Sequence, residues 1–316
     1  MAYKLELDED LRTGIRRAAQ EQLDRAIREL SERITEDPVD AVHSARKAVK
    51  KERSLLRLAR GTMPPQQRRR ENAALREAAR ALSTARDAEV MVATVGDLSE
   101  RYAGQLPETT FDEIRAELGR VRDEQRRQLV GSALGTQAVQ ELGAVRLRTE
   151  DWELHRGGWG ALQRGLARSY ADGRRAFARA RARRSAEALH AARKRVKDLW
   201  YQERLLAPAC GPAVAGHAQE AHRLADLLGD DHDLAVLRQA LAQGRIRAAA
   251  DIEAVVALID HRRSELQREA LHLGERLYAE KTRAFLRRMH ASWRAGRRMA
   301  AARSEEHPRE LAAATR

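Results

Sequence analysis

Two short segments of the chain carry the same hydrogen-bond-donating side chains at the same spacing. In each segment a histidine is followed by arginine at +3 and by lysine at +4 and +7. The two sets are His43, Arg46, Lys47 and Lys50, and His190, Arg193, Lys194 and Lys197. On a helix these offsets place all four side chains on one face about 100° wide. Imidazole, guanidinium and ammonium groups donate hydrogen bonds, so the pattern predicts two sites for an anion rich in oxygen acceptors.

The charge sign of these faces argues against the simpler interpretation of a solvated helix surface. A face that only keeps a helix soluble usually alternates glutamate with lysine at i,i+4. These two faces carry no carboxylate, and each extends by one more cation, Arg57 in the first segment and Arg204 in the second. Tyr201 lies on the second face as well. The absence of acidic residues favours binding over solvation.

Lysine is concentrated in the same two segments. Of the 60 basic residues only seven are lysine, at positions 4, 47, 50, 51, 194, 197 and 281. Five of these seven fall in the two segments. An ammonium group is a compact charge on a flexible stem, which suits an irregular row of phosphates, whereas arginine prefers a fixed two-pronged geometry. The ligand that this distribution favours is a chain of phosphates.

The two histidines are expected to share an unusual electrostatic environment. Neighbouring cations should lower the pKa of each imidazole, which can still donate one N–H when it is neutral. A bound polyanion would favour the charged form again. We therefore expect His43 and His190 to donate hydrogen bonds to the ligand while the surrounding cations neutralise it.

The elements that position these residues belong to a longer internal repeat. VHSARKAVKKERS at 42–54 aligns with LHAARKRVKDLWY at 189–201, and LSTARDAEVM at 82–91 aligns with LGDDHDLAVL at 228–237. Apolar side chains recur every three or four residues on both sides of these segments, which indicates amphipathic helices. The expected helices span residues 9–34, 39–60, 65–99, 109–147, 159–183, 186–206, 212–243 and 248–295.

The fold predicted from this repeat is all-α. Aromatic residues make up only 4% of the chain, while alanine, leucine, arginine and glutamate dominate, which favours helices over strands. Short connections give two tandem four-helix bundles, residues 1–148 and 149–295, related by pseudo-two-fold symmetry around a basic groove or channel. Residues 296–316 have mixed charge and no apolar stripe, so we expect a disordered tail.

Overall composition limits the class of partner. The formal charge of +13 attracts polyanions without selecting among nucleic acid, anionic membrane and polyphosphate. The single cysteine, Cys210, suits a reducing compartment, and the sequence contains no signal-like start and no apolar run of about 18 residues. We expect a cytoplasmic protein without membrane contact.

These motifs resemble the CHAD domain, the conserved-histidine α-helical domain, over residues 9–295. The resemblance rests on the two H-x-x-R-K-x-x-K segments, on Tyr201 and on the third-helix segments at Arg86-Asp87 and 228–236. It implies two four-helix repeats around a basic pocket that binds inorganic polyphosphate without catalysis. Polyphosphate granules or a polyphosphate-metabolising enzyme are the implied partners. The expected binding residues are His43, Arg46, Lys47, Lys50, Lys51, Arg57, His190, Arg193, Lys194, Lys197, Tyr201 and Arg204, with Lys281 and Arg283 at the rim.

The sequence departs from the family's pattern at three positions. Asp198 stands where a second cation is common, Trp200 where arginine often occurs, and Glu52 where an apolar residue is usual. These departures bear on the strength of the second site and leave the shared histidine, arginine and lysine positions intact.

Two other functions remain open. The same groove could bind nucleic acid without sequence specificity, because phosphate contacts dominate such binding. The GDDHD segment, with His232 and Asp233, could belong to a helical metal-dependent phosphohydrolase. Against an enzyme, His232 and Asp233 align with Arg86 and Asp87, and the chain lacks nucleotide-binding and paired-cysteine motifs. We expect no metal and no cofactor.

Overall fold

The computed structural model describes residues 3–7, 9–82, 84–130, 133–246 and 251–314. Side chains are not described for residues 84–87, 126, 128–130, 133–134 and 303–314. Within the described residues every regular element is a helix, which confirms the all-α prediction. None of these helices is apolar over a stretch long enough to span a membrane.

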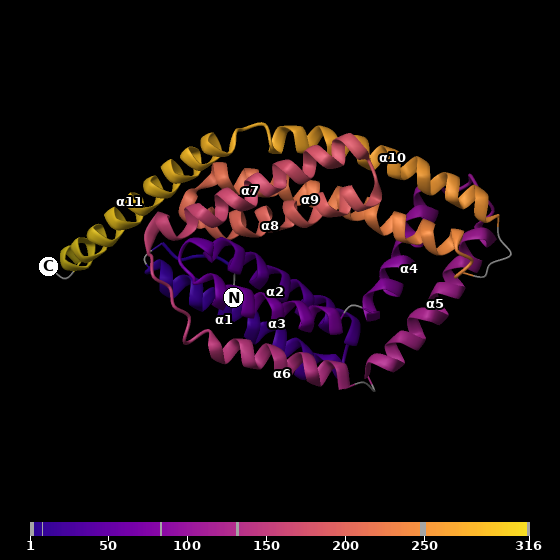
Figure 1. Ribbon diagram of the computed structural model, residues 1–316, viewed down its shortest axis with the longest axis horizontal. Helices are drawn as coiled ribbons and strands as arrows, with labels where there is room; N and C mark the ends of the chain where they lie inside the picture. Colours follow the sequence, from indigo (N-terminus) through magenta and orange to yellow (C-terminus); the bar gives the residue numbers. More distant parts are fainter. Residues whose placement is uncertain (1–2, 8, 83, 131–132, 247–250, 315–316) are drawn as a thin grey trace.

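Eleven α-helices and two short 3-10 helices follow one another along the described chain (Figure 1). They are α1 (Leu11–Ser31), η1 (Arg33–Thr35), α2 (Pro38–Leu58), η2 (Ala59–Gly61), α3 (Pro65–Ala81), α4 (Thr84–Arg101), α5 (Glu108–Val130), α6 (Ala133–Arg148), α7 (Gly158–Arg183), α8 (Ala186–Cys210), α9 (Pro212–Ala242), α10 (Ile252–Leu277) and α11 (Thr282–Ala314).

The two halves of the chain share one hydrophobic core. Buried side chains of the first half, such as Ile15 and Leu55, belong to the same apolar cluster as Leu166 and Leu205 of the second half. The helix α2 packs directly against α7 and α8. The two halves therefore pack against each other through their apolar faces. The tandem repeat with pseudo-two-fold symmetry stays a prediction.

A second, smaller cluster joins the far ends of the two halves. Helices α4 and α5 extend away from the other helices of the first half and reach α9 and α10 (Figure 1). Val95 and Phe111 of the first half lie in one apolar cluster with Leu237 and Ile259 of the second. This contact holds α4 beside α9, where both helices border the pocket described below.

Three expected helices are each divided into two. The ranges 65–99, 109–147 and 248–295 correspond to α3 with α4, α5 with α6, and α10 with α11. After α10, the Tyr170 hydroxyl donates to the carbonyl oxygens of Leu277 and Glu280, at 3.3 and 3.2 Å. A side chain from another helix thus satisfies carbonyl groups that a continuous helix would pair itself.

Residues 296–314 are helical. The segment 296–314, expected to be disordered, instead continues α11 as far as Ala314. The Arg297 guanidinium donates to the backbone oxygens of Leu7 and Glu9, and so ties this part of α11 to the N-terminal segment. The long-range contact was not visible in the sequence pattern, which shows no apolar stripe here.

Local capping and one helix crossing set the positions of the two basic helices. The Asp37 carboxylate accepts hydrogen bonds from the first turn of α2, and the Ser185 hydroxyl does the same for α8. Where the helices cross, the buried Ser54 hydroxyl of α2 donates to the carbonyl oxygen of Asp198 in α8 at 2.9 Å. Gln202 donates back to the Ser54 carbonyl oxygen at 3.3 Å. These bonds fix the two basic faces against each other.

Candidate anion-binding pocket

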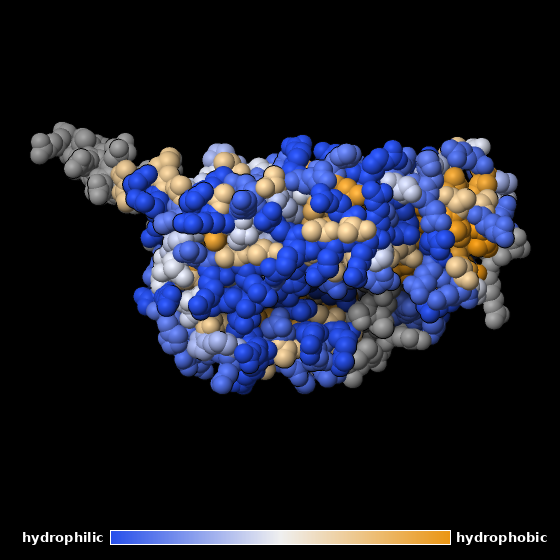
Figure 2. All heavy atoms as spheres, turned by 45° about the horizontal axis from the view of Figure 1, so that its top comes forward, coloured by the Kyte–Doolittle hydropathy of each residue, from blue (hydrophilic) through white to orange (hydrophobic). Residues whose placement is uncertain are grey.

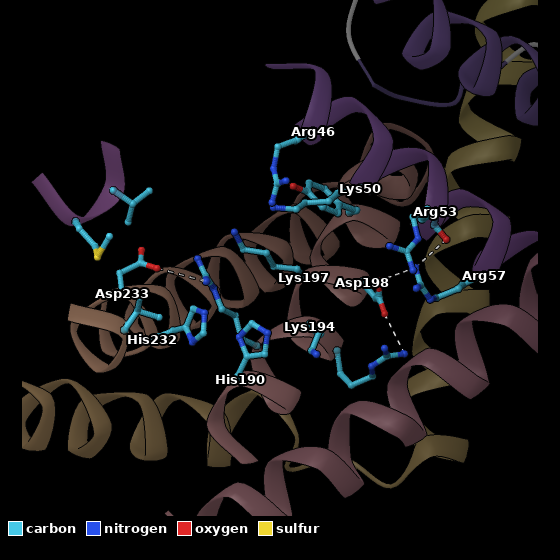
Figure 3. A pocket seen from close by; sticks show the side chains of 16 residues that line it. Arg46, Lys50, Arg53, Arg57, His190, Lys194, Lys197, Asp198, His232 and Asp233 are labelled. Atoms are coloured by element: carbon cyan, nitrogen blue, oxygen red, sulfur yellow. Dashed lines mark hydrogen bonds and ion pairs between the residues drawn. The ribbon is translucent and has the colours of Figure 1, made fainter. Parts of the chain in front are cut away.

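A pocket of about 420 Å³ opens between α2 and α8 and is bordered by α4 and α9 (Figure 3). Its walls come from four helices, two from each half of the chain. The lining residues are Arg46, Lys50, Arg53 and Arg57 of α2, Val90 and Met91 of α4, His190, Arg193, Lys194, Arg195, Lys197, Asp198 and Tyr201 of α8, and His232, Asp233 and Val236 of α9.

The pocket is strongly cationic. Eight lysine and arginine side chains line it, against two aspartates. Two histidines add further hydrogen-bond donors without fixed charge. So many like charges in one cavity repel one another, and an anion with several negative charges would relieve that repulsion.

The structure brings most of the predicted site residues together. Those that line the pocket are Arg46, Lys50, Arg57, His190, Arg193, Lys194, Lys197 and Tyr201. Those that do not line it are His43, Lys47, Lys51, Arg204, Lys281 and Arg283. The second H-x-x-R-K-x-x-K segment is represented in full, whereas the first contributes only its second and fourth members.

The difference on α2 is one of rotation about the helix axis. Arg46, Lys50, Arg53 and Arg57 lie within about 60° of one another at 100° per residue. His43 and Lys47 lie on the other edge of the same face, and Lys47 is exposed. Only the edge that turns towards α8 and α9 borders the pocket. Sequence reasoning missed Arg53 because it centred the face on the histidine, although Arg53 follows Lys50 by three residues.

Lys51 lies outside the pocket, beside Tyr3. Its ammonium group lies over the ring of Tyr3, 5.5 Å from the centroid. Burial, together with the charges of Arg204, Arg25 and Lys47, lowers the pKa of Lys51 to about 8. Arg204 is exposed on α8 and borders a separate surface hollow with Trp200.

Asp198 anchors two of the pocket's arginines. Its carboxylate lies 3.1 Å from an amino nitrogen of Arg57 and 3.2 Å from one of Arg195 (Figure 3). Burial raises the pKa of Asp198, and the two guanidinium groups oppose that shift. Asp198 stands where a cation is common in the resembling family. Here its carboxylate holds two arginines in place and neutralises part of the positive charge of the pocket.

The two pocket histidines contact each other. The rings of His190 and His232 stack with centroids 4.0 Å apart. Burial lowers the pKa of His190 to about 4, and the nearby charges of His232, Lys194, Arg193 and Lys50 add to the effect. The Nδ1 atom of His190 is buried without a hydrogen-bond partner in the described part of the chain. His190 is therefore neutral at pH 7, as expected for a histidine among cations.

Backbone contacts hold other pocket arginines. Arg46 donates to the carbonyl oxygens of Ala79 and Leu82, at 3.2 and 2.8 Å, and so caps the end of α3. Arg193 lies against the backbone of α9 at Gly229, where an added Cβ atom would be 2.7 Å from a guanidinium nitrogen. The guanidinium of Arg193 approaches the carboxylate of Asp233 at 4.0 Å.

Two carboxylates of the GDDHD segment, those of Asp231 and Asp233, face guanidinium groups. Asp231 is buried and accepts hydrogen bonds from Arg263 and Gln267, at 3.1 and 2.7 Å. Among the described residues, no three His, Cys, Asp or Glu side chains gather closely enough to hold a metal ion. The side chains of the aligned Arg86 and Asp87 lie outside the described residues.

Fold and pocket together define an all-helical protein with a cationic cavity between helices of its two halves. The sequence matches the model of the CHAD domain over residues 17–242, and the chain belongs to this family.

Two solved structures share the fold. The CHAD domain from the plant Ricinus communis superposes with a TM-score of 0.61 at 21% identity, covering 86% of this chain and 95% of that one. PptA from Streptomyces chartreusis gives a TM-score of 0.58 at 16% identity, covering 86% of this chain and all of that one. The comparison with curated proteins found no match.

Proposed function

We propose that the pocket binds inorganic polyphosphate and does not cleave it. The observation that carries this proposal is the convergence of Lys50, Lys194 and Lys197, three of the seven lysines in the chain, from two helices on one cavity. Flexible ammonium groups can follow an irregular row of phosphates. Membership of the CHAD family supports the same ligand class.

A phosphate chain without bases suits the cavity better than a nucleic acid does. Single strands are held largely by stacking of bases on exposed aromatic rings. Tyr201 is only 4% exposed, and His190 and His232 already stack on each other. The pocket therefore offers many phosphate contacts and little surface for bases.

The residues divide into two roles in this proposal. Lys50, Lys194 and Lys197 neutralise successive phosphates, while His190 contributes a hydrogen bond. The arginines Arg46 and Arg57 are already tied to a carbonyl group or a carboxylate, so they shape the cavity and supply a fixed field.

The absence of catalysis is part of the proposal. Phosphoryl transfer usually requires metal ions at the phosphates and a residue that positions the attacking water. The carboxylates of Asp198 and Asp233 face arginines in this pocket. Incubation with polyphosphate should therefore release no phosphate, with or without added divalent cations. Sustained release that a pocket variant abolishes would contradict this part.

Calorimetric titration tests the ligand class. Short-chain polyphosphate and single-stranded DNA, matched in phosphate concentration, would each be titrated into the protein at several salt concentrations. Four to eight phosphate contacts predict a slope of log K against log salt of about −3 to −6, at about −0.7 per contact. Polyphosphate should bind much more tightly than DNA. Equal affinity for both ligands would refute the proposed selectivity.

We also propose that the protein acts in the cytoplasm, on polyphosphate granules or beside an enzyme that metabolises the polymer. Such binding predicts that a fluorescent fusion gathers at granules in cells that make polyphosphate. In cells unable to make the polymer the fusion should be diffuse. Unchanged localisation in the two strains would count against a granule role.

A further inference from the structure

The exposed face of α11 carries a row of arginines that takes no part in the pocket. Arg283, Arg287, Arg294 and Arg298 are all exposed and lie within about 60° of one another on the helix. The opposite face, with Phe285, Met289 and Trp293, is buried in the core. None of these arginines lines the cavity between α2 and α8.

The row lies in a part of the chain that is rich in arginine. Some exposed arginines elsewhere pair with carboxylates, as Arg120 does with Glu117 and Arg223 with Glu269. The row itself makes no ion pair among the described residues, and the sequence from 281 to 304 contains no aspartate or glutamate. A row of positive charges without neighbouring carboxylates is typical of a surface that binds a polyanion.

From these observations we propose that α11 binds the phosphodiester backbone of double-stranded nucleic acid. Arg283 and Arg298 are 15 residues apart, which spans about 22 Å of helix or about six base pairs of a duplex. The guanidinium fork suits the regularly placed phosphates of a rigid duplex, whereas the pocket uses lysines for a flexible chain. The inference does not depend on the ligand proposed for the pocket.

A membrane surface fits this face less well. Helices that lie on membranes bury large apolar side chains beside their cations. On α11 the side chains of Phe285, Met289 and Trp293 face the core, and Met299 is the one large apolar side chain exposed among those described for this helix. In Figure 2 the strongest apolar colour gathers at the end of the molecule opposite α11, and the surface near α11 is largely hydrophilic.

Fluorescence anisotropy with a labelled 20-base-pair DNA duplex tests the inference. The test variant combines Arg283→Gln, Arg287→Gln, Arg294→Gln and Arg298→Gln. The control combines Arg115→Gln, Arg120→Gln, Arg127→Gln and Arg223→Gln, four exposed arginines that pair with carboxylates, and so changes the net charge equally. Thermal unfolding midpoints would verify that both variants fold.

The α11 variant should bind the duplex at least tenfold more weakly, with a salt slope shallower by about 3 to 4, at about 0.9 per contact. The control should stay within threefold of wild type, and both variants should bind short polyphosphate as wild type does. Equal losses in the two variants would mean that net charge alone attracts DNA. The assignment would also be overturned if the α11 variant lost its binding to polyphosphate or to anionic lipid vesicles and still bound the DNA duplex.

Discussion

The imidazole of His190 stacks on that of His232, with ring centroids 4.0 Å apart and an angle of 27° between the planes. The two residues come from α8 and α9, so the contact depends on the packing of these helices. It keeps a neutral hydrogen-bond donor within a wall of cations. A ligand with high negative charge would change the protonation of His190.

Binding of polyphosphate should therefore be linked to proton uptake. The pKa of His190 is about 4 without ligand, because burial and like charge disfavour the imidazolium. A bound polyanion favours the charged form and raises that pKa, so affinity should increase as pH falls from about 6 towards 4. Calorimetry at pH 5.5 in buffers of different ionisation enthalpy counts the protons taken up.

The variant His190→Gln provides the control, because it removes this titration and leaves the ligand's own titration unchanged. It should take up fewer protons than wild type. Equal uptake by the two proteins would place the titrating group elsewhere.

Arg46→Ala should weaken both folding and binding. Its guanidinium donates to two carbonyl oxygens at the end of α3, and losing such charged hydrogen bonds costs about 1–3 kcal/mol of unfolding free energy. Lys194→Ala, on the exposed side of α8, should weaken binding alone. Urea unfolding and calorimetry on both variants separate the two effects. A normally stable Arg46→Ala protein would contradict the capping role.

Asp198→Asn should move stability and affinity in opposite directions. Removing the carboxylate leaves Arg57 and Arg195 without their shared partner, and because both guanidinium groups are partly exposed the free energy of unfolding should fall by about 1–3 kcal/mol. The same change adds net positive charge to the pocket, so polyphosphate should bind more tightly. Unfolding and titration experiments at 10 °C would measure both quantities. Weaker binding by a well-folded variant would show that Asp198 mainly orients the arginines.

Glu52 should make the fold less stable as pH rises. It is fully buried, its carboxyl oxygens have no hydrogen-bond partner among the described residues, and burial together with the charge of Glu71 raises its pKa to about 8. The native state therefore keeps a proton that the unfolded chain releases near pH 4.5. Consequently the free energy of unfolding should fall between pH 4.5 and about 8.

Glu52→Gln should flatten this part of the pH profile, and Glu52→Leu should stabilise the protein at pH 8 by about 1–3 kcal/mol. Urea unfolding at pH 5 and pH 8 measures both changes. An identical pH dependence in wild type and Glu52→Gln would contradict this view of Glu52.

Local periodicity predicted the helices that pack along their whole length. The expected ranges 159–183 and 212–243 agree with α7 and α9 to within one residue. The break after α10 could not be predicted, because it depends on a hydroxyl group of Tyr170, more than 100 residues away. Repeat alignment likewise could not show that both halves would share one core.

At the site, too, local spacing predicted some features and long-range packing determined the others. Spacing placed His190, Arg193, Lys194 and Lys197 on one face, and the structure puts all four at the pocket. On α2, spacing could not tell which edge of the basic face turns towards α8. The ion pair between Asp198 and Arg57 could not be predicted from the sequence either, because it depends on where α2 and α8 cross.

The most direct test of the account compares two lysine variants of equal net charge. One combines Lys50→Ala, Lys194→Ala and Lys197→Ala, which all line the pocket, and the other combines Lys47→Ala, Lys51→Ala and Lys281→Ala, which do not. Calorimetric titration with short-chain polyphosphate should show at least about a 100-fold loss of affinity for the first variant, since each charged contact contributes about 1.5–3 kcal/mol. The second variant should stay within about threefold of wild type, a change of less than 1 kcal/mol. Equal losses in the two variants would contradict the account, because net charge and not the pocket would then hold the polymer.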